Sequence, residues 1–145
     1  MTTAEHLDTI DRLLAREFAA EPVRTTAGGG GPGFHLVRLS RTPDLWDDDG
    51  SGRAEAAGQI SAEYGALVQA AADRWGEPQV FAVGTVLERG LAGERAAQPW
   101  AELSECTDHV HLWRAGERWL VVCVTQWDGE GPYFLTAAVT VVDPP

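Results

Sequence analysis

The last third of the chain is its most constraining feature, because it contains three strand-like runs separated by turns. Residues 109–115, 118–127 and 133–142 are rich in β-branched and aromatic side chains, which favour a pleated sheet. The dipeptide Gly116-Glu117 between the first two runs fits a two-residue hairpin turn that begins with glycine. The segment DGEGP separates the second run from the third. We therefore predict an antiparallel three-stranded meander here.

Two earlier segments have apolar residues at helical spacing. The first begins at Thr2 and Glu5, which fit a capping box, and it stops before Pro22 because the residue before proline avoids helical angles. The second predicts a helix from about residue 53 to residue 75. Its apolar stripe consists of Ala57, Ile60, Tyr64, Leu67, Val68, Ala71 and Trp75.

These segments together predict an α+β fold in a single domain that spans residues 1–145. We expect a mainly antiparallel sheet of four to five strands, with the two main helices packed on one face. The glycine-rich stretch 25–33 is expected to be an internal linker, and residues 42–52 an acidic loop. A phosphate-binding loop is excluded for the glycines because no GK[ST] motif and no helix follow them.

The charge of the chain limits its partners. Acidic residues number 22 and basic residues 11, all of them arginine, which gives a formal net charge of −11. Such a chain repels phosphate backbones, so we expect no nucleic-acid partner. The longest apolar run is far shorter than the roughly 20 residues of a membrane span, and the N-terminus lacks the pattern of a signal peptide. We therefore expect a cytoplasmic protein without a membrane partner.

His109 and His111 form the first candidate site, because they alternate along an expected strand. Alternation places both imidazoles on one face of this strand, together with Trp113. Imidazole is a common ligand of zinc and other first-row metals, but a site needs at least a third protein ligand. These two histidines therefore suggest a ligand or metal site that is incomplete in the sequence.

The expected hairpin register tests whether the partner strand supplies that third ligand. With Gly116-Glu117 as the turn, the residues opposite His109, His111 and Trp113 are all aliphatic, namely Val124, Val122 and Leu120. A third ligand would have to come from His35, Glu105, Asp108 or a helix carboxylate. None of these has diagnostic spacing, so we expect no metal and no other cofactor.

The segment ECTDH contains the components of a cysteine-nucleophile centre. Cys106, Asp108 and His109 supply a thiol, a carboxylate and an imidazole. Such centres are recognised by geometry and are usually built from residues far apart in the sequence, so we interpret this cluster as coincidence. Cys123 lies inside an apolar run and is expected to be a small buried hydrophobic residue.

The acidic loop resembles a calcium-binding EF-hand loop only in part. When Gly50 is aligned with the required glycine, Asp47 and Asp49 fall on ligand positions. Leu45 and Ala56 then occupy the two anchor positions that need an acidic ligand. High-affinity calcium binding of the EF-hand type is therefore not expected.

The same loop suggests a contact surface for a basic partner. Residues 42–63 contain six acidic residues and one arginine. Within them Trp46 is followed by Asp47, Asp48 and Asp49, an aromatic anchor beside carboxylates. The alternative is that Trp46 packs on the core while the aspartates solvate the loop.

We therefore expect a non-enzymatic interaction protein that binds a basic protein surface through Trp46 and Asp47 to Asp49. This acidic, tryptophan-rich α+β character resembles that of bacterial immunity and antitoxin-type proteins, and the resemblance covers no motif. One alternative is a small-molecule-binding or metal-dependent enzyme that uses a cleft near His109, His111 and His35. Another is a homo-oligomeric structural protein that associates through an exposed tryptophan face or through an unpaired edge at residues 133–142.

Overall fold

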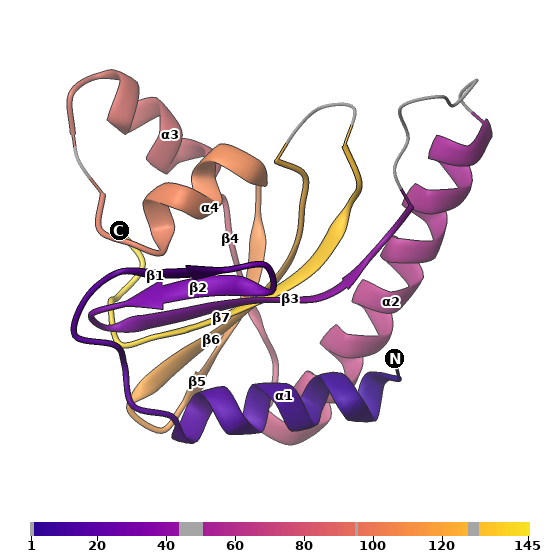
Figure 1. The fold of residues 1–145 in the computed structure, drawn as a ribbon, viewed down its shortest axis with the longest axis horizontal. Helices are drawn as coiled ribbons and strands as arrows, with labels where there is room; N and C mark the ends of the chain where they lie inside the picture. The colour runs from indigo at the N-terminus through magenta and orange to yellow at the C-terminus, as the bar shows by residue number, and fades with distance from the viewer. Residues whose placement is uncertain (1, 44–50, 95, 128–130) are drawn as a thin grey trace.

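Seven antiparallel strands form one sheet in the computed structural model, which describes residues 2–43, 51–94, 96–127 and 131–145 (Figure 1). Their order across the sheet differs from their order in the chain, because the last strand lies in the middle. In chain order the strands are β1 (Val23–Thr25), β2 (Gly28–Gly31), β3 (Phe34–Arg41), β4 (Gln79–Phe81), β5 (Val110–Ala115), β6 (Arg118–Thr125) and β7 (Phe134–Thr140). Across the sheet the order is β1-β2-β3-β7-β6-β5-β4.

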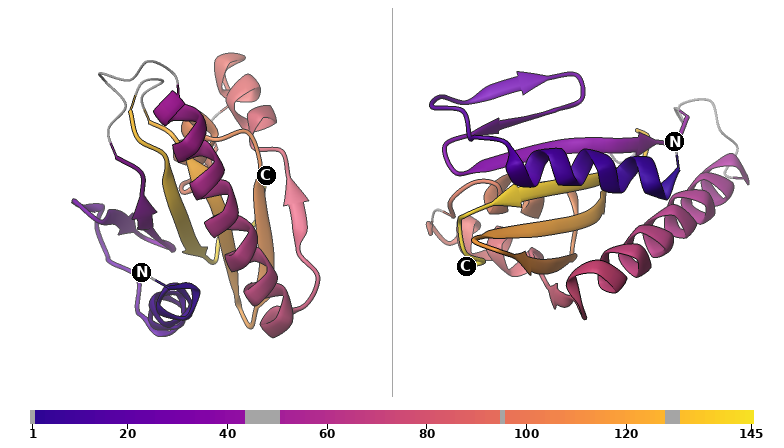
Figure 2. Two further views of the ribbon diagram at one scale, coloured as in Figure 1. Left: turned by 90° about the vertical axis from the view of Figure 1, so that its right-hand side faces the viewer. Right: turned by 90° about the horizontal axis from the view of Figure 1, so that it is seen from below.

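Four described helices cover the two faces of this sheet (Figure 2). They are α1 (Thr3–Ala15), α2 (Ser51–Trp75), α3 (Gly84–Leu91) and α4 (Trp100–Cys106). The two longer helices, α1 and α2, pack on one face, and α4 packs on the other with α3 beside it. The α+β class is therefore confirmed, and no described helix has both the length and the apolar character needed to cross a membrane.

The first helix begins where the sequence predicts. Thr2 Oγ1 accepts from the Glu5 amide at 3.2 Å, and Glu5 Oε2 accepts from the Thr2 amide at 2.9 Å. This reciprocal pair satisfies two backbone donors that the first turn of a helix leaves free. The capping box is therefore present.

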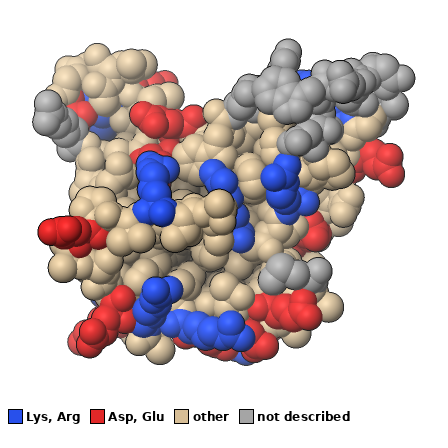
Figure 3. Space-filling model, viewed as in Figure 1, with Lys and Arg blue, Asp and Glu red and all other residues tan. Residues whose placement is uncertain are grey.

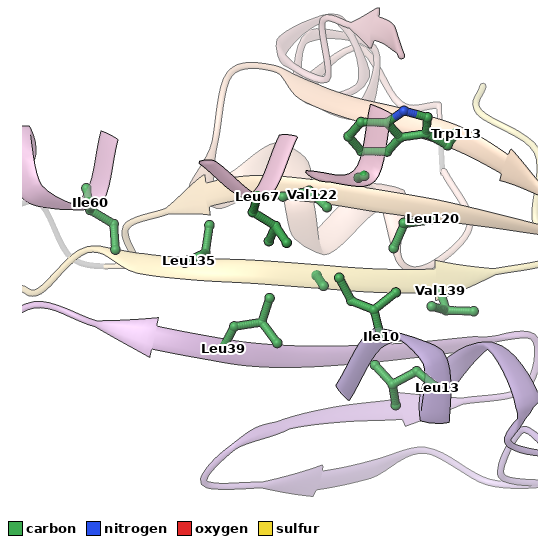
Figure 4. Packing of buried hydrophobic residues seen from close by; sticks show 12 residues of the cluster. Ile10, Leu13, Leu39, Ile60, Leu67, Trp113, Leu120, Val122, Leu135 and Val139 are labelled. Atoms are coloured by element: carbon green, nitrogen blue, oxygen red, sulfur yellow. The ribbon is translucent and has the colours of Figure 1, made fainter. Parts of the chain in front are cut away.

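One hydrophobic cluster lies between the sheet and the two longer helices. Figure 4 shows side chains from both helices meeting those of the central strands. Ile10 and Leu67 are fully buried, and Trp113 donates its indole N–H to the Gly76 carbonyl oxygen at 2.8 Å. The buried members are Ile10, Leu13, Leu39, Ile60, Leu67, Ala71, Trp113, Leu120, Val122, Leu135, Ala137 and Val139.

A second cluster fills the opposite face, where α4 packs. Trp100 is fully buried there and donates its indole N–H to the Val142 carbonyl oxygen at 3.0 Å. Trp119 packs on this cluster, whereas Trp113 belongs to the first, so the two tryptophans lie on opposite faces of the sheet. The second cluster consists of Leu36, Val83, Trp100, Leu103, Cys106, Val110, Leu112, Val121, Cys123 and Ala138.

The C-terminal meander has the predicted register. His111 pairs with Val122, Trp113 with Leu120 and Ala115 with Arg118 across the β5–β6 hairpin. Gly116 adopts a φ of 66°, which a glycine at this turn accommodates without strain. Strand β5 begins only at Val110, so His109 lies just outside it.

Two expectations about the sheet were wrong. The sheet has seven strands and not four to five, and the supposed linker 25–33 contains the strand β2, which pairs with β1 and β3. Four glycines carry no β-branched or aromatic signal, so the run resembles a linker in sequence. Glycine is needed at position 28 because the backbone of β3 lies so close to it. A Cβ at Gly28 would lie 2.1 Å from the Leu36 carbonyl oxygen.

The expected free edge at residues 133–142 was also wrong. Strand β7 pairs with β3 on one side and with β6 on the other, and all its residues are buried. A long-range partner, β3, covers the edge that a simple meander would leave open. Self-association through this segment is therefore excluded by its position in the sheet.

Candidate functional site

His111 is held against α2 by a hydrogen bond to a tyrosine. The His111 Nδ1 and Tyr64 Oη atoms lie 2.5 Å apart, and the same hydroxyl donates to the Val122 carbonyl oxygen at 3.2 Å. Burial lowers the pKa of His111, and the neighbouring His109 lowers it further. Burial raises the pKa of the Tyr64 hydroxyl, so it stays protonated as a donor. His111 is therefore a neutral, hydrogen-bonded side chain.

His109 lies beside His111 but is exposed. The two ring centroids are 6.3 Å apart, with their planes inclined at 64°. His109 lines a shallow surface hollow with Cys106, Asp108 and Tyr133. Among the residues that the structure describes, no group of three or more His, Cys, Asp or Glu side chains is arranged to hold a metal ion.

His35 lies away from the other two histidines, at the start of β3. Its ring contacts Phe18, with 4.9 Å between centroids, and its Nε2 lies 3.3 Å from the Arg16 carbonyl oxygen. Burial lowers the pKa of His35, which is 7% exposed. His35 therefore packs behind the end of α1 and does not join His109 and His111.

Cys106 is a buried thiol at the end of α4. Its Sγ lies 3.5 Å from the carbonyl oxygens of Glu102 and Leu103, and the residue is 7% exposed. Burial, with the nearby charges of Glu102 and Glu105, raises the pKa of Cys106 to about 12. A thiol with such a pKa is a poor nucleophile at neutral pH. Burial also raises the pKa of Cys123 in β6.

Trp46 and Asp47 to Asp49 lie outside the described residues, but the chain on either side of their loop is described. Thr42 is buried, and its amide donates to the Tyr133 carbonyl oxygen at 3.0 Å. In return the Tyr133 amide donates to Thr42 Oγ1 at 2.9 Å. We call this reciprocal pair the Thr42–Tyr133 junction. It holds Thr42, which precedes segment 44–50 in the chain, next to Tyr133, which follows segment 128–130.

Arg38 forms a second candidate site, which the sequence did not single out. It lies on β3, on the sheet face that carries α4, and its guanidinium lies over two aromatic rings. The Arg38 Cζ atom lies 4.3 Å from the ring centroid of Phe134 and 5.4 Å from that of Trp127. In Figure 3 positively charged side chains gather over the strands β1 to β3 on this face of an otherwise acidic chain.

Two buried donors near this stack have no acceptor. Arg38 Nε and the indole Nε1 of Trp127 are both shielded from solvent, and neither has a hydrogen-bond partner. A buried donor without an acceptor costs about 1–3 kcal/mol. Both side chains line a hollow of about 220 Å³ between β1, β2, β3 and α4. We call this hollow the Arg38 pocket; it is lined by Pro22, Val23, Arg24, Thr25, Gly28, Gly29, Gly30, Phe34, Leu36, Arg38, Gln98, Glu102 and Trp127.

The Arg38 pocket has one more positive than negative side chain. Arg24 donates to Glu102 Oε1 at 2.6 Å, so these two charges offset one another. Arg38 forms no ion pair with any described carboxylate. The rest of the wall is mixed, with Phe34 and Leu36 beside the glycines of β2 and with Thr25 and Gln98 as uncharged polar residues. One guanidinium charge therefore faces a small, partly apolar hollow.

A weak signal for this pocket exists in the sequence. Phe34, Leu36 and Arg38 alternate along β3, so a charged side chain ends an apolar face of a strand. The aromatic partners Phe134 and Trp127 come from a segment about 90 residues later, and no spacing rule connects them to Arg38. Pairing of β3 with β7 brings them together.

Comparisons with protein-family models, with curated proteins and with solved structures find no match to this chain.

Proposed function

We propose that this protein is a non-enzymatic interaction protein that binds a basic surface on a protein partner. The observation that carries the proposal is the Thr42–Tyr133 junction, which ties the flanks of two acidic segments to one end of the sheet. Segments 44–50 and 128–130 contain six of the chain's 22 acidic residues and no basic residue. Four of these six acidic residues lie within the seven residues of segment 44–50.

Electrostatic steering followed by aromatic anchoring is the mechanism that we propose. A concentrated negative potential raises the rate at which a basic partner associates, and the effect weakens as salt is added. Trp46, within segment 44–50, is the proposed anchor, because tryptophan is among the residues that contribute most to binding when buried at an interface. Asp47, Asp48 and Asp49 are the proposed charge partners. This mode of binding is that of an immunity-like or accessory protein.

The chemistry of the histidine and cysteine sites supports a binding role over a catalytic one. The raised pKa of Cys106, about 12, leaves little thiolate at neutral pH. The Nδ1 atom of His111 is engaged by Tyr64, and the lowered pKa of His111 keeps the ring neutral. These contacts stabilise the fold at the places where catalysis would need an available nucleophile or base.

The proposal is tested by capture of a partner from the lysate of the source organism with wild-type and charge-neutralised baits. The neutralised bait carries Asp47→Asn, Asp48→Asn and Asp49→Asn together. A matched control carries Asp8→Asn, Asp73→Asn and Glu117→Gln, three exposed acidic residues of the helices and the β5–β6 turn. We expect the wild type and the control to retain one basic protein at low salt, and the neutralised bait to lose it.

The captured protein is then purified and its affinity measured as a function of salt. A basic partner whose dissociation constant rises with salt, and rises further on Asp47–Asp49 neutralisation or Trp46→Ala, supports the proposal. A partner that binds all baits equally, or one that is acidic, contradicts it. Elemental analysis of the same preparations bears on the enzymatic alternative, which requires a stoichiometric metal that is lost on His109→Ala.

A further inference from the structure

We propose that the Arg38 pocket binds a single carboxylate group, with the Arg38 guanidinium as its charge partner and the Trp127 indole N–H as a second donor. The ligand is a small organic acid or the terminal carboxylate of a peptide. None of the residues that line this pocket is one of those proposed above to bind a basic partner, so either proposal can fail without the other.

Stacking prepares Arg38 for this role. The Arg38 Cζ atom lies over the rings of Phe134 and Trp127, 4.3 Å and 5.4 Å from their centroids. All five N–H donors of an arginine lie in the guanidinium plane, so stacking leaves them free to point at a ligand. The stack also restricts the rotamers of Arg38 before binding, which reduces the entropy lost when a ligand is held.

The two donors without acceptors indicate where the ligand oxygens lie. Arg38 Nε and Trp127 Nε1 are buried and unpaired, and both side chains line the same hollow. A carboxylate has two acceptor oxygens and no donor, so it can accept from both of these N–H groups at once. Charge-assisted hydrogen bonds to arginine are among the strongest that proteins form.

The charge of the pocket favours a carboxylate over a phosphate. Arg24 and Glu102 cancel each other, which leaves the single positive charge of Arg38. A monoanion balances this charge, whereas a phosphate near neutral pH adds a second negative charge beside Glu102. A chain with a net charge of −11 increases that penalty. Phe34 and Leu36 offer an apolar wall to the body of the acid.

The experiment follows the indole N–H resonances of the protein by nuclear magnetic resonance while benzoate is added. The chain has six tryptophans, and Trp127→Phe identifies the signal of Trp127 by its loss. We expect the Trp127 signal to shift downfield and to saturate. The indole signal of Trp113, which donates to Gly76 on the other sheet face, should not move. A Trp127 signal that does not respond overturns the proposal.

Variants of the pocket separate recognition from general charge. Arg38→Gln should abolish the shift, and Arg38→Lys should weaken binding by roughly 10-fold, because lysine lacks the planar fork. Glu102→Gln should tighten binding by removing a competing negative charge. Arg114→Gln is the matched control, since Arg114 also stacks on a tryptophan, 5.0 Å from the Trp119 ring, but pairs with Asp143. An equal loss of binding in Arg114→Gln overturns the proposal.

Two further binding experiments identify the class of ligand. Inorganic phosphate should shift the Trp127 signal less than benzoate does, and tighter binding of phosphate overturns the assignment to a carboxylate. A tetrapeptide with a free C-terminus is compared with the same peptide amidated. Binding of the free peptide more tightly than benzoate identifies a peptide terminus as the source, and the reverse order identifies a small organic acid. If Arg38→Gln unfolds the protein, Glu102→Gln and Arg38→Lys still decide the outcome.

Discussion

Single arginines perform several different tasks in a chain that has no lysine. Arg118 donates from one Nη1 to the carbonyl oxygens of Leu13 and Arg16 at 2.9 and 2.6 Å, and its Cζ lies 4.1 Å from the Phe18 ring centroid. It therefore closes the C-terminal end of α1 from a strand more than 100 residues away. Arg74, by contrast, bridges α2 to Asp11 on the exposed surface and lies over the Trp75 ring.

Replacement of Arg118 by alanine should lower the free energy of unfolding by about 2 kcal/mol, because the hydrogen bonds from its charged guanidinium to the Leu13 and Arg16 carbonyl oxygens are lost. Urea denaturation of the variant measures the change. Arg114→Ala, which removes an exposed arginine, should cost less than about 0.5 kcal/mol. Equal losses in the two variants would refute this role of Arg118.

Buried histidines should make the protein sensitive to mild acid. Burial lowers the pKa of His6 and of His35 below the ordinary value of 6.5. The unfolded chain therefore takes up protons at a higher pH than the folded chain. The lowered pKa values of the two histidines therefore contribute to the free energy of unfolding above about pH 6.5. This contribution is lost as the pH falls through the pKa values of the folded state.

Urea midpoints measured at a series of pH values should fall below about pH 6.5. His35→Gln should flatten part of this slope, because one group that takes up a proton on unfolding is removed. His109→Gln is the comparison, since that side chain is exposed. A slope that is unchanged in His35→Gln would show that other groups dominate the acid response.

At the scale of elements, the sequence predicted correctly those features that residues close together in the chain determine. The capping box at Thr2 and the turn at Gly116 are local, so the start of α1 and the β5–β6 register followed from the sequence, whereas α1 ends at Ala15, well before the predicted stop at Pro22. The strand β2 did not, since glycines form it only because β1 and β3 flank them. The Arg38 pocket was missed for a related reason, because Trp127 and Phe134, whose rings lie against Arg38, come from a segment about 90 residues later in the chain.

The glycines of β2 and those of α2 should respond to alanine in opposite ways. Gly28→Ala should destabilise the protein by several kcal/mol, because the new Cβ would lie 2.1 Å from the Leu36 carbonyl oxygen and φ is +151°. Gly58→Ala should stabilise it by about 0.5–1 kcal/mol, because no atom lies within 4 Å and alanine favours a helix.

Thermal denaturation of the two glycine variants side by side measures both effects. Gly65→Ala is a second helical control, again with open space around the new Cβ. A tolerated alanine at Gly28 would mean that β2 does not pair closely with β3 in solution.

At the scale of the whole molecule, a net charge of −11 on 145 residues opposes folding by repulsion. Added salt screens this repulsion, so the melting temperature should rise by roughly 2–5 °C between low and moderate salt, the change that about 1 kcal/mol produces. A variant with Glu17→Gln, Glu21→Gln and Glu117→Gln should show a smaller rise. A melting temperature that falls with salt would contradict this expectation.

The backbone of β2 divides two hollows. Gly28, Gly29 and Gly30 line the Arg38 pocket on one face and a hollow of about 280 Å³ beside His35 on the other. A methyl group at Gly30 would point toward His35 Nδ1, 3.4 Å away, and one at Gly31 toward the Phe34 ring, 3.0 Å away. The backbone of β2 alone therefore separates the two hollows. Because successive residues of a strand face opposite sides of the sheet, a side chain introduced on β2 enters one hollow or the other according to its position. A shift of the β2–β3 pairing register by one residue would make each residue of β2 face the opposite hollow.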